Sequence, residues 1–158
     1  MKLSRSTGYG LIAVGYIAQY GDNNTAILAS TISEEYGIPL EYLLKILQLL
    51  VRSNVLRSKR GPRGGFYLTK SLEETTLLEI VEAVDGPMNN ELQLPEKAKD
   101  TSFILKISGA CSRITEKTRD MLAAVKLSDV VVNEKAKETA EQQEQSQPKP
   151  TLHQKDEY

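Results

Sequence analysis

Residues 38–66 read IPLEYLLKILQLLVRSNVLRSKRGPRGGF and join a helical pattern to a basic, glycine-rich turn. The first half predicts a helix, because large apolar side chains recur there every three or four residues, at Leu43, Ile46, Leu47 and Leu50. Pro39 suits the first turn of that helix, where a missing N–H costs no hydrogen bond. The polar residues of the helix share another face, at Glu41, Lys45, Gln48 and Arg52. Such a face can hydrogen-bond base edges in a major groove.

The second half of this stretch predicts a β-hairpin. Residues 55–60 and 66–69 are strand-like, and residues 61–65 between them have the glycine and proline content of a turn. Between residues 52 and 63 the chain carries only positive charges, at Arg52, Arg57, Lys59, Arg60 and Arg63. A basic hairpin tip flanked by glycines can contact phosphates or enter a narrow minor groove.

Two further helices are predicted upstream, over residues 3–20 and 25–36. Their expected core positions are Leu11, Ile12, Val14, Ile17 and Ala18 in the first, and Ile27, Leu28 and Ile32 in the second. Gly37 is placed to end the second helix in a left-handed conformation. Helix, glycine turn and helix predict a helix-turn-helix, whose second helix enters the major groove while the first crosses the DNA backbone.

A second strong pattern lies in residues 101–126, which predict a long helix. Residues of this helix recur at alternating spacings of three and four and form a heptad seam, made of Ile104, Ile107, Cys111, Ile114, Thr118, Met121 and Val125. A stripe this narrow needs a partner helix, and a second copy about a twofold axis is the economical partner. The alternative is that the seam packs on its own domain.

These patterns predict a mainly α fold with a small β-hairpin wing, in which a winged helix-turn-helix domain is joined to a long dimerisation helix. We place the winged domain at residues 1–86 and a connecting loop at 87–100. The dimerisation helix and a short final element follow at 101–132. Residues 133–158 are rich in Glu, Lys, Gln and Pro and predict a disordered tail, because they cannot bury enough apolar surface to offset the entropy of ordering.

The charge of the chain is unevenly distributed. The net charge is −1 over 158 residues, but residues 1–70 carry nine Lys and Arg against four Asp and Glu, whereas residues 71–158 carry eleven against seventeen. A basic half beside an acidic half is expected when one part meets DNA and the other does not. No apolar run approaches the ~20 residues of a membrane-spanning helix. The N-terminus lacks the layout of a signal peptide, so we expect a cytoplasmic protein without a membrane partner.

The chain resembles the Rrf2 family of bacterial winged helix-turn-helix transcriptional regulators over roughly residues 1–132. The resemblance rests on residues 1–4 and 9–11, Tyr42-Leu43, and the ranges 60–66, 76–86 and 127–130. It implies a homodimeric regulator, most often a repressor, that pairs through its long helix. Many relatives carry cysteines in the loop at residues 88–100 that ligate an iron–sulfur cluster, and this chain has none there.

The helix and the wing together give a set of residues that we expect to contact double-stranded DNA. Tyr42 and Lys45 are predicted to contact base edges, and Glu41 to accept from a cytosine amino group. Pro39, with Leu40, lies where an apolar contact to a thymine methyl is possible. The phosphates or the minor groove are assigned to Arg57, Lys59, Arg60 and Arg63, and the predicted set is completed by Arg52, Gly64 and Gly65. Two such units on a twofold axis predict an approximately palindromic operator.

The sequence offers little redox or metal chemistry. Cys111 is the only thiol and His153 the only imidazole, so we expect no metal site and no cofactor within one chain. Cys111 is read most simply as a packing residue of the seam. Alternatively, it could form a redox-sensitive bridge to its mate, with Lys106 and Arg113 favouring the thiolate.

The sequence gives little support to an enzyme. Residues 61–65 are not a Walker motif and the paired carboxylates lie near predicted helix ends, so we expect no enzyme activity. Three alternatives stay open: a regulator of the same family that senses iron–sulfur, metal or thiol state, a winged domain that binds only proteins, and a regulator with a small-molecule effector. The sequence names no effector, but its pocket would lie between the winged domain and the long helix.

Overall fold

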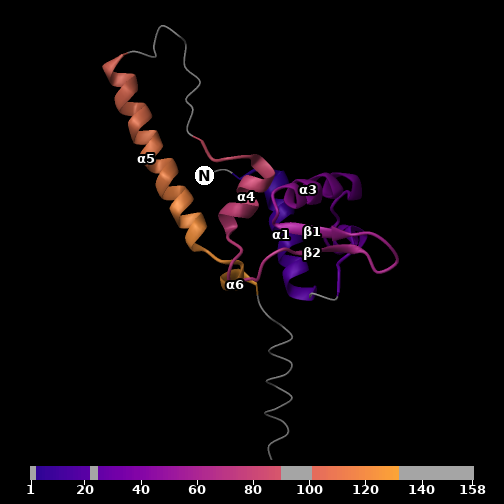
Figure 1. The fold of residues 1–158 in the computed structure, drawn as a ribbon. Helices are drawn as coiled ribbons and strands as arrows, with labels where there is room; N and C mark the ends of the chain where they lie inside the picture. Colours follow the sequence, from indigo (N-terminus) through magenta and orange to yellow (C-terminus); the bar gives the residue numbers. More distant parts are fainter. Residues whose placement is uncertain (1–2, 22–24, 90–100, 132–158) are drawn as a thin grey trace, which may run out of the picture.

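The computed structural model describes residues 3–21, 25–89 and 101–131. The predicted tail and residues 90–100 of the predicted loop lie outside the described residues. In chain order the elements are α1 (Arg5–Tyr20), α2 (Ala29–Tyr36), α3 (Leu40–Arg52), β1 (Leu56–Lys59), β2 (Gly65–Leu68), α4 (Leu77–Asp85), α5 (Ser102–Ala124) and α6 (Leu127–Val130). The predicted fold class, mainly helical with a two-stranded hairpin, is confirmed (Figure 1).

The core lies between α1, α3 and α4. The predicted apolar face of α3 is confirmed, since Leu43, Ile46, Leu47 and Leu50 are at most 2% exposed. Val14 and Ile17 of α1 and Ile80 of α4 meet this face. Helices α1 and α4 approach closely at Gly10, where an added Cβ would lie 2.9 Å from Cγ2 of Val84. The contact accounts for a glycine in the middle of a helix, where it weakens the helix intrinsically.

The second helix begins later than the sequence pattern predicts. It starts at Ala29 rather than at residue 25, and Ile27 forms an isolated antiparallel bridge with Phe66 of β2. The Ile27 N–H donates to the Phe66 carbonyl at 2.9 Å, and the Phe66 N–H donates to the Ile27 carbonyl at 2.8 Å. In an extended segment neighbouring side chains point to opposite faces. Ile27 is therefore buried, whereas Leu28, a predicted core residue, is 53% exposed.

One other core prediction was wrong, in α1. Ile12 is 37% exposed, while Ala13 beside it is fully buried. The buried positions of α1 instead include Thr7, Gly10, Ala13, Val14 and Ile17, a stripe centred on small residues. Small side chains suit this stripe because α4 packs close against it.

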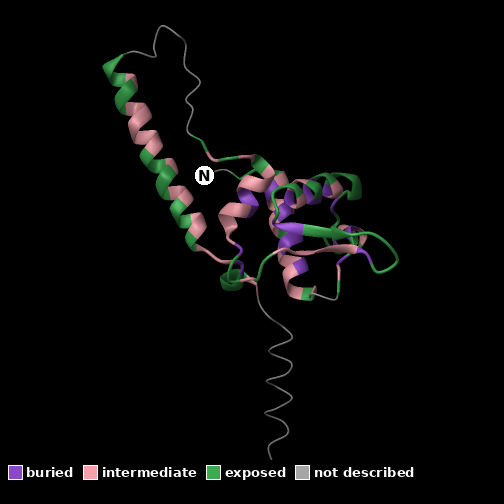
Figure 2. Ribbon diagram, in the orientation of Figure 1, coloured by how far each residue is buried: buried purple, intermediate pink, exposed green. Residues whose placement is uncertain are grey.

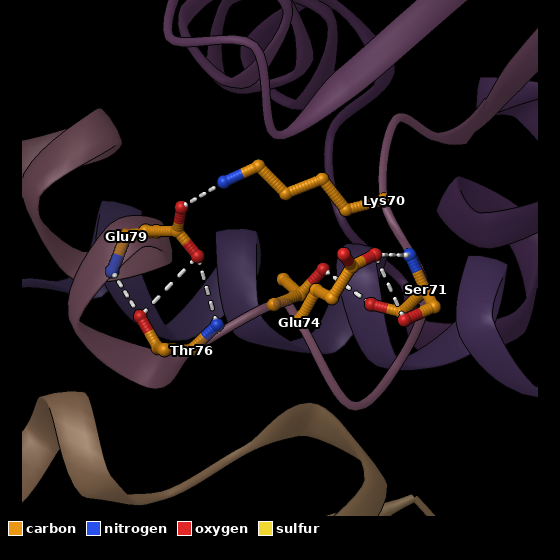
Figure 3. Close-up of polar contacts among 6 residues, drawn as sticks. Lys70, Ser71, Glu74, Thr76 and Glu79 are labelled. Atoms are coloured by element: carbon orange, nitrogen blue, oxygen red, sulfur yellow. Dashed lines mark hydrogen bonds and ion pairs between the residues drawn. The ribbon is translucent and has the colours of Figure 1, made fainter.

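Helix α4 starts with a capping box that also holds the end of the wing (Figure 3). The Glu79 N–H donates to the Thr76 hydroxyl at 3.2 Å, and the Thr76 N–H donates to Glu79 Oε2 at 2.9 Å. The other carboxylate oxygen, Glu79 Oε1, accepts from Lys70 Nζ at 2.5 Å. Burial raises the pKa of Glu79, but the hydrogen bonds from Lys70 and Thr76 outweigh it and hold that pKa below its usual value.

This shift predicts a pH-dependent contribution to stability. A carboxyl group with a lowered folded-state pKa stabilises the protein above its unfolded pKa, about 4.3, and loses that contribution as the pH falls through the folded value. We therefore expect Glu79→Gln to lower the free energy of unfolding at neutral pH, and the difference from the unsubstituted protein to shrink progressively below about pH 5. Urea unfolding at a series of pH values measures this difference. Glu73→Gln, at an exposed position of the same turn, is the matched control. A difference that stays constant with pH would contradict the assignment.

Helix α5 runs along one side of the molecule, contacts α4 through the ion pair of Arg119 with Glu82, and continues at its C-terminal end into α6 (Figure 1). None of its residues is fully buried (Figure 2). Directly after it, the Leu127 N–H donates to the Thr75 carbonyl at 2.8 Å, and the Leu77 N–H donates to the Val125 carbonyl at 3.1 Å. The Leu127 side chain, 2% exposed, belongs to the core of the winged domain. The short helix α6 therefore anchors α5 to that domain.

Candidate nucleic-acid interface

The polar face of α3 is free for a ligand. Glu41, Lys45, Gln48 and Arg52 are all exposed, on the side opposite the buried leucines. Pro39 and Leu40, at the start of the helix, are exposed as well. The prediction that this face is solvent-accessible is confirmed, and the assignment of individual residues to DNA groups stays a prediction.

Tyr42 is held in place by the first turns of α1. Its hydroxyl lies 2.5 Å from the Ser6 hydroxyl, and its ring packs edge-on against Tyr9 with 5.8 Å between ring centroids. The side chain keeps 39% of its surface exposed. Ser6 and Tyr9 are not in the predicted set, because no local sequence pattern indicates a contact as distant along the chain as that of Ser6 with Tyr42, 36 residues apart. Both residues orient the predicted base-contacting tyrosine before any ligand arrives.

The wing presents its predicted cations to solvent. Strands β1 and β2 pair antiparallel, with Arg57 opposite Tyr67 and Lys59 opposite Gly65. Lys59, Arg60 and Arg63 are exposed around the tip. The Arg57 guanidinium lies over the Tyr67 ring at 4.6 Å from its centroid, a cation–π contact that directs this cation along the face of the hairpin.

The two glycines of the predicted site are required by the backbone. An added Cβ at Gly64 would lie 2.3 Å from the Lys59 carbonyl oxygen, and Gly64 is buried. Gly65 has φ +143°, and an added Cβ there would lie 2.5 Å from the carbonyl oxygen of Ile27. These glycines shape the turn that carries the cations.

In Figure 1, α3 and the hairpin lie at the end of the molecule that points away from α5.

The predicted heptad seam is divided between two environments. Ile114 and Met121 are 66% and 72% exposed, while the other five positions are half-buried. A neighbouring face of α5 packs on α4, where Arg119 forms an ion pair with Glu82. The packed face is not the predicted seam itself, so both the dimer contact and the self-packing alternative stay predictions, and the side with Ile114 and Met121 has no covering element within the described residues. Cys111 is half-buried with a free thiol.

A small cavity of about 210 Å³ lies between the winged domain and α5, where the sequence analysis placed a possible effector pocket. Leu3, Val81, Asp85 and Met88 line it from one side and Thr115 from α5. Nothing about its lining identifies a ligand. Over the residues that the structure describes, no helix is long and apolar enough to span a membrane.

Comparison with known proteins yields a family and named relatives. The model of the Rrf2 family, described as an iron-dependent transcriptional regulator, matches residues 3–133. BadM of Rhodopseudomonas palustris, named as an HTH-type transcriptional regulator, is 36% identical over 100 residues, which cover 63% of this chain and 61% of BadM. IscR of Xenorhabdus nematophila, an HTH-type transcriptional regulator, is 26% identical over 145 residues, covering 91% of this chain and 87% of that protein.

The iron named in the family description requires ligands, and this chain does not supply the usual ones. Iron–sulfur clusters are held by several cysteine thiolates, and the whole sequence has one cysteine. In residues 3–21, 25–89 and 101–131, no three His, Cys, Asp or Glu side chains are grouped to hold a metal ion. The residues of a single chain do not fit a cysteine-ligated cluster.

The fold agrees with the sequence comparison. The structure of CymR, the global cysteine regulator of Bacillus subtilis, superposes with a TM-score of 0.63 at 23% identity, covering 82% of this chain and 95% of that one. At this identity the likeness concerns the fold alone. With the family model matched across residues 3–133, the chain belongs to the Rrf2 family of helix-turn-helix transcriptional regulators.

Proposed function

We propose that two copies of this chain pair along α5 and bind an approximately palindromic operator in double-stranded DNA, acting as a repressor. The main observation behind the proposal is that the predicted DNA-contacting surface and the exposed part of the seam lie on different sides of the molecule. The exposed polar face of α3 and the cationic wing lie at one end of the molecule, and the exposed part of the seam lies at the other (Figures 1 and 2). A regulator that dimerises through one surface and binds DNA through the other requires this arrangement.

The exposed part of the seam supports self-association. Ile114 and Met121 are one heptad apart, and Phe103, 70% exposed, continues the stripe toward the start of α5. Exposed single apolar residues are common, but aligned large ones on one helix face mark an interaction surface. A second copy provides an identical stripe and closes the contact by symmetry.

The proposal is tested by selecting bound duplexes from a random pool at about 0.15 M salt, where non-specific phosphate contacts are weakened. We expect an inverted repeat to be enriched. A pool that shows no enrichment, with protein that binds all duplexes equally or none, would contradict specific DNA recognition and favour the protein-interaction alternative.

Substitutions in α3 and in the wing should have different consequences. Lys45→Ala is expected to relax sequence preference at one or two base positions, with a cost of ~1–3 kcal/mol there. Arg63→Ala is expected to weaken binding to all sequences alike and to lower the slope of log affinity against log salt by about one unit. Titrations of the selected operator and its single-base variants at several salt concentrations measure both. If the two substitutions behave alike, the assignment of α3 to base contacts is wrong.

We also propose that regulation uses no resident iron–sulfur cluster and no catalytic step. A single half-buried thiol supports this view, because one cysteine per protomer cannot provide the three or four thiolates of an ordinary cluster. The visible absorption spectrum of anaerobically purified protein tests it, and charge-transfer bands in that spectrum would contradict the proposal.

A further inference from the structure

Glu82 of α4 receives two hydrogen bonds on one carboxylate oxygen. Arg119 of α5 donates through Nη1 to Glu82 Oε1 and forms an ion pair with it, and the Met88 N–H donates to the same oxygen at 3.0 Å. The two side chains are 23% and 37% exposed, so neither is fully hydrated. Glu82 thus joins three separate pieces of the chain: α4, the segment that leaves it, and the long helix.

This contact supplies the second point at which α5 is fixed to the winged domain. The first is at its C-terminal end, where backbone hydrogen bonds join Val125 and Leu127 to the start of α4. A helix held at one end can still change its angle about that end. Arg119 lies six residues before Val125, or about 9 Å along the axis at 1.5 Å per residue. With this second attachment point at Glu82, the angle of α5 relative to the winged domain is fixed.

The rest of the described interface between α4 and α5 buries no α5 residue completely. The cavity of about 210 Å³ begins one turn further along, between Val81 and Asp85 on α4 and Thr115 on α5. No residue of α5 is fully buried, so apolar packing leaves the helix room to tilt. A displacement of 1 Å at Arg119 becomes about 4 Å at the start of α5, which lies ~35 Å from the pivot.

On the other side, α4 is firmly connected to the DNA-binding surface. Asp85 Oδ1 accepts from the Ser4 hydroxyl at 2.6 Å, and Ser4 caps α1 by accepting from the Thr7 N–H at 3.0 Å. One helical turn contains both Ser4 and Ser6, and Ser6 contacts the Tyr42 hydroxyl on α3. We call the exposed polar face of α3 together with the cationic wing the reading surface. Because α4 is connected to this surface, the angle between α4 and α5 also sets the angle between the reading surface and the proposed dimer helix.

We infer that Glu82 is a positioning residue that sets the separation of the two reading surfaces, and so selects the spacing between the operator half-sites. The inference rests on the proposed function, in which two copies pair along α5. One base pair of additional spacer moves a half-site by about 3.4 Å and rotates it by roughly 35°. That step is comparable with the ~4 Å displacement that a small tilt at Arg119 produces.

The test uses the full chain and a panel of duplexes that carry the selected half-sites with the spacer changed one base pair at a time. We expect the unsubstituted protein to prefer one spacing at least tenfold over its neighbours. Glu82→Ala should reduce that preference to less than threefold, while its affinity for a single half-site and its dimeric state in sedimentation remain unchanged. Glu116→Ala, at an exposed position of α5, is the matched control and should keep the sharp profile.

Arg119→Ala removes the same contact from a helix that contributes no fully buried residue, and it decides the matter if Glu82→Ala does not fold. The double substitution should broaden the profile no further than either single one, because both remove one interaction. Unchanged spacing profiles in these variants, or additive effects in the double one, would overturn the inference and leave the proposed function intact. An unsubstituted protein that is monomeric or shows no operator would instead overturn the proposed function.

Discussion

Ile114→Asp is expected to separate the proposed dimer into monomers at micromolar concentration and to lower operator affinity about 100-fold or more. The side chain is 66% exposed in the single chain, so the substitution leaves the winged domain folded. In the proposed dimer the new carboxylate would lie in an apolar contact with its own symmetry mate opposite, and burying unpaired like charges is costly. Once the two reading surfaces are no longer linked, the gain from simultaneous binding, ~10²–10⁴ in affinity, is lost.

Leu105→Asp provides a closely matched control for this experiment. Leu105 is 63% exposed on the same helix, but it lies nine residues before Ile114, which places it on the opposite side at 3.6 residues per turn. Sedimentation equilibrium and operator titration should therefore find this variant dimeric and active. If Leu105→Asp dissociates the dimer and Ile114→Asp does not, the stripe with Ile114 and Met121 is not the contact.

Gly65→Ala should disable the wing. The residue has φ +143°, which alanine rarely adopts, and its Cβ would lie 2.5 Å from the carbonyl oxygen of Ile27. The strained backbone conformation of an alanine at this φ costs ~1–3 kcal/mol of stability. The shift of the chain needed to relieve the overlap of its Cβ with the Ile27 carbonyl costs a further ~1–3 kcal/mol. We expect the free energy of unfolding to fall by at least about 2 kcal/mol in urea titrations, and operator affinity to fall because the bridge between Ile27 and Phe66 opens.

Gly61→Ala separates the two causes of that loss. Gly61 also has a positive φ, +109°, but an added Cβ there would have no atom within 4 Å. Gly61→Ala should therefore strain the backbone without any steric overlap of the added Cβ, and it should lower the free energy of unfolding less than Gly65→Ala does. Equal losses in the two variants would show that close contact with the Ile27 backbone does not determine the geometry of the wing.

The parts of this fold that could be predicted from sequence are those set by local periodicity. The apolar face of α3 follows from four residues within two turns, and all four are buried. The start of α2 could not be predicted in the same way, because Ile27 is held extended by Phe66, which is far along the chain. Tertiary pairing there prevails over a helical pattern that would otherwise extend upstream.

In the candidate site, too, the features set by local sequence could be predicted and the contacts between distant residues could not. The exposed cations of the wing and the polar face of α3 follow from residue type and spacing. The contacts that orient them do not: Ser6 meets Tyr42 across 36 residues, and Glu82 meets Arg119 across 37. Contacts between residues this far apart cannot be predicted from a short stretch of sequence. The heptad spacing predicts that Ile114 and Met121 share one face of α5, and the structure adds that α4 packs on a neighbouring face and leaves these two side chains exposed.

The return of α6 to the winged domain has a consequence for how this chain can be divided. Leu127 fills a core position beside residues that come more than forty places earlier, so a fragment ending at residue 86 would have a vacancy where that leucine belongs. Losing a buried leucine side chain costs ~2–5 kcal/mol, a large share of the stability of a domain this small. The core of the winged domain is therefore completed by a residue that follows α5, so the winged domain and the long helix cannot be separated at residue 86 without a loss of stability.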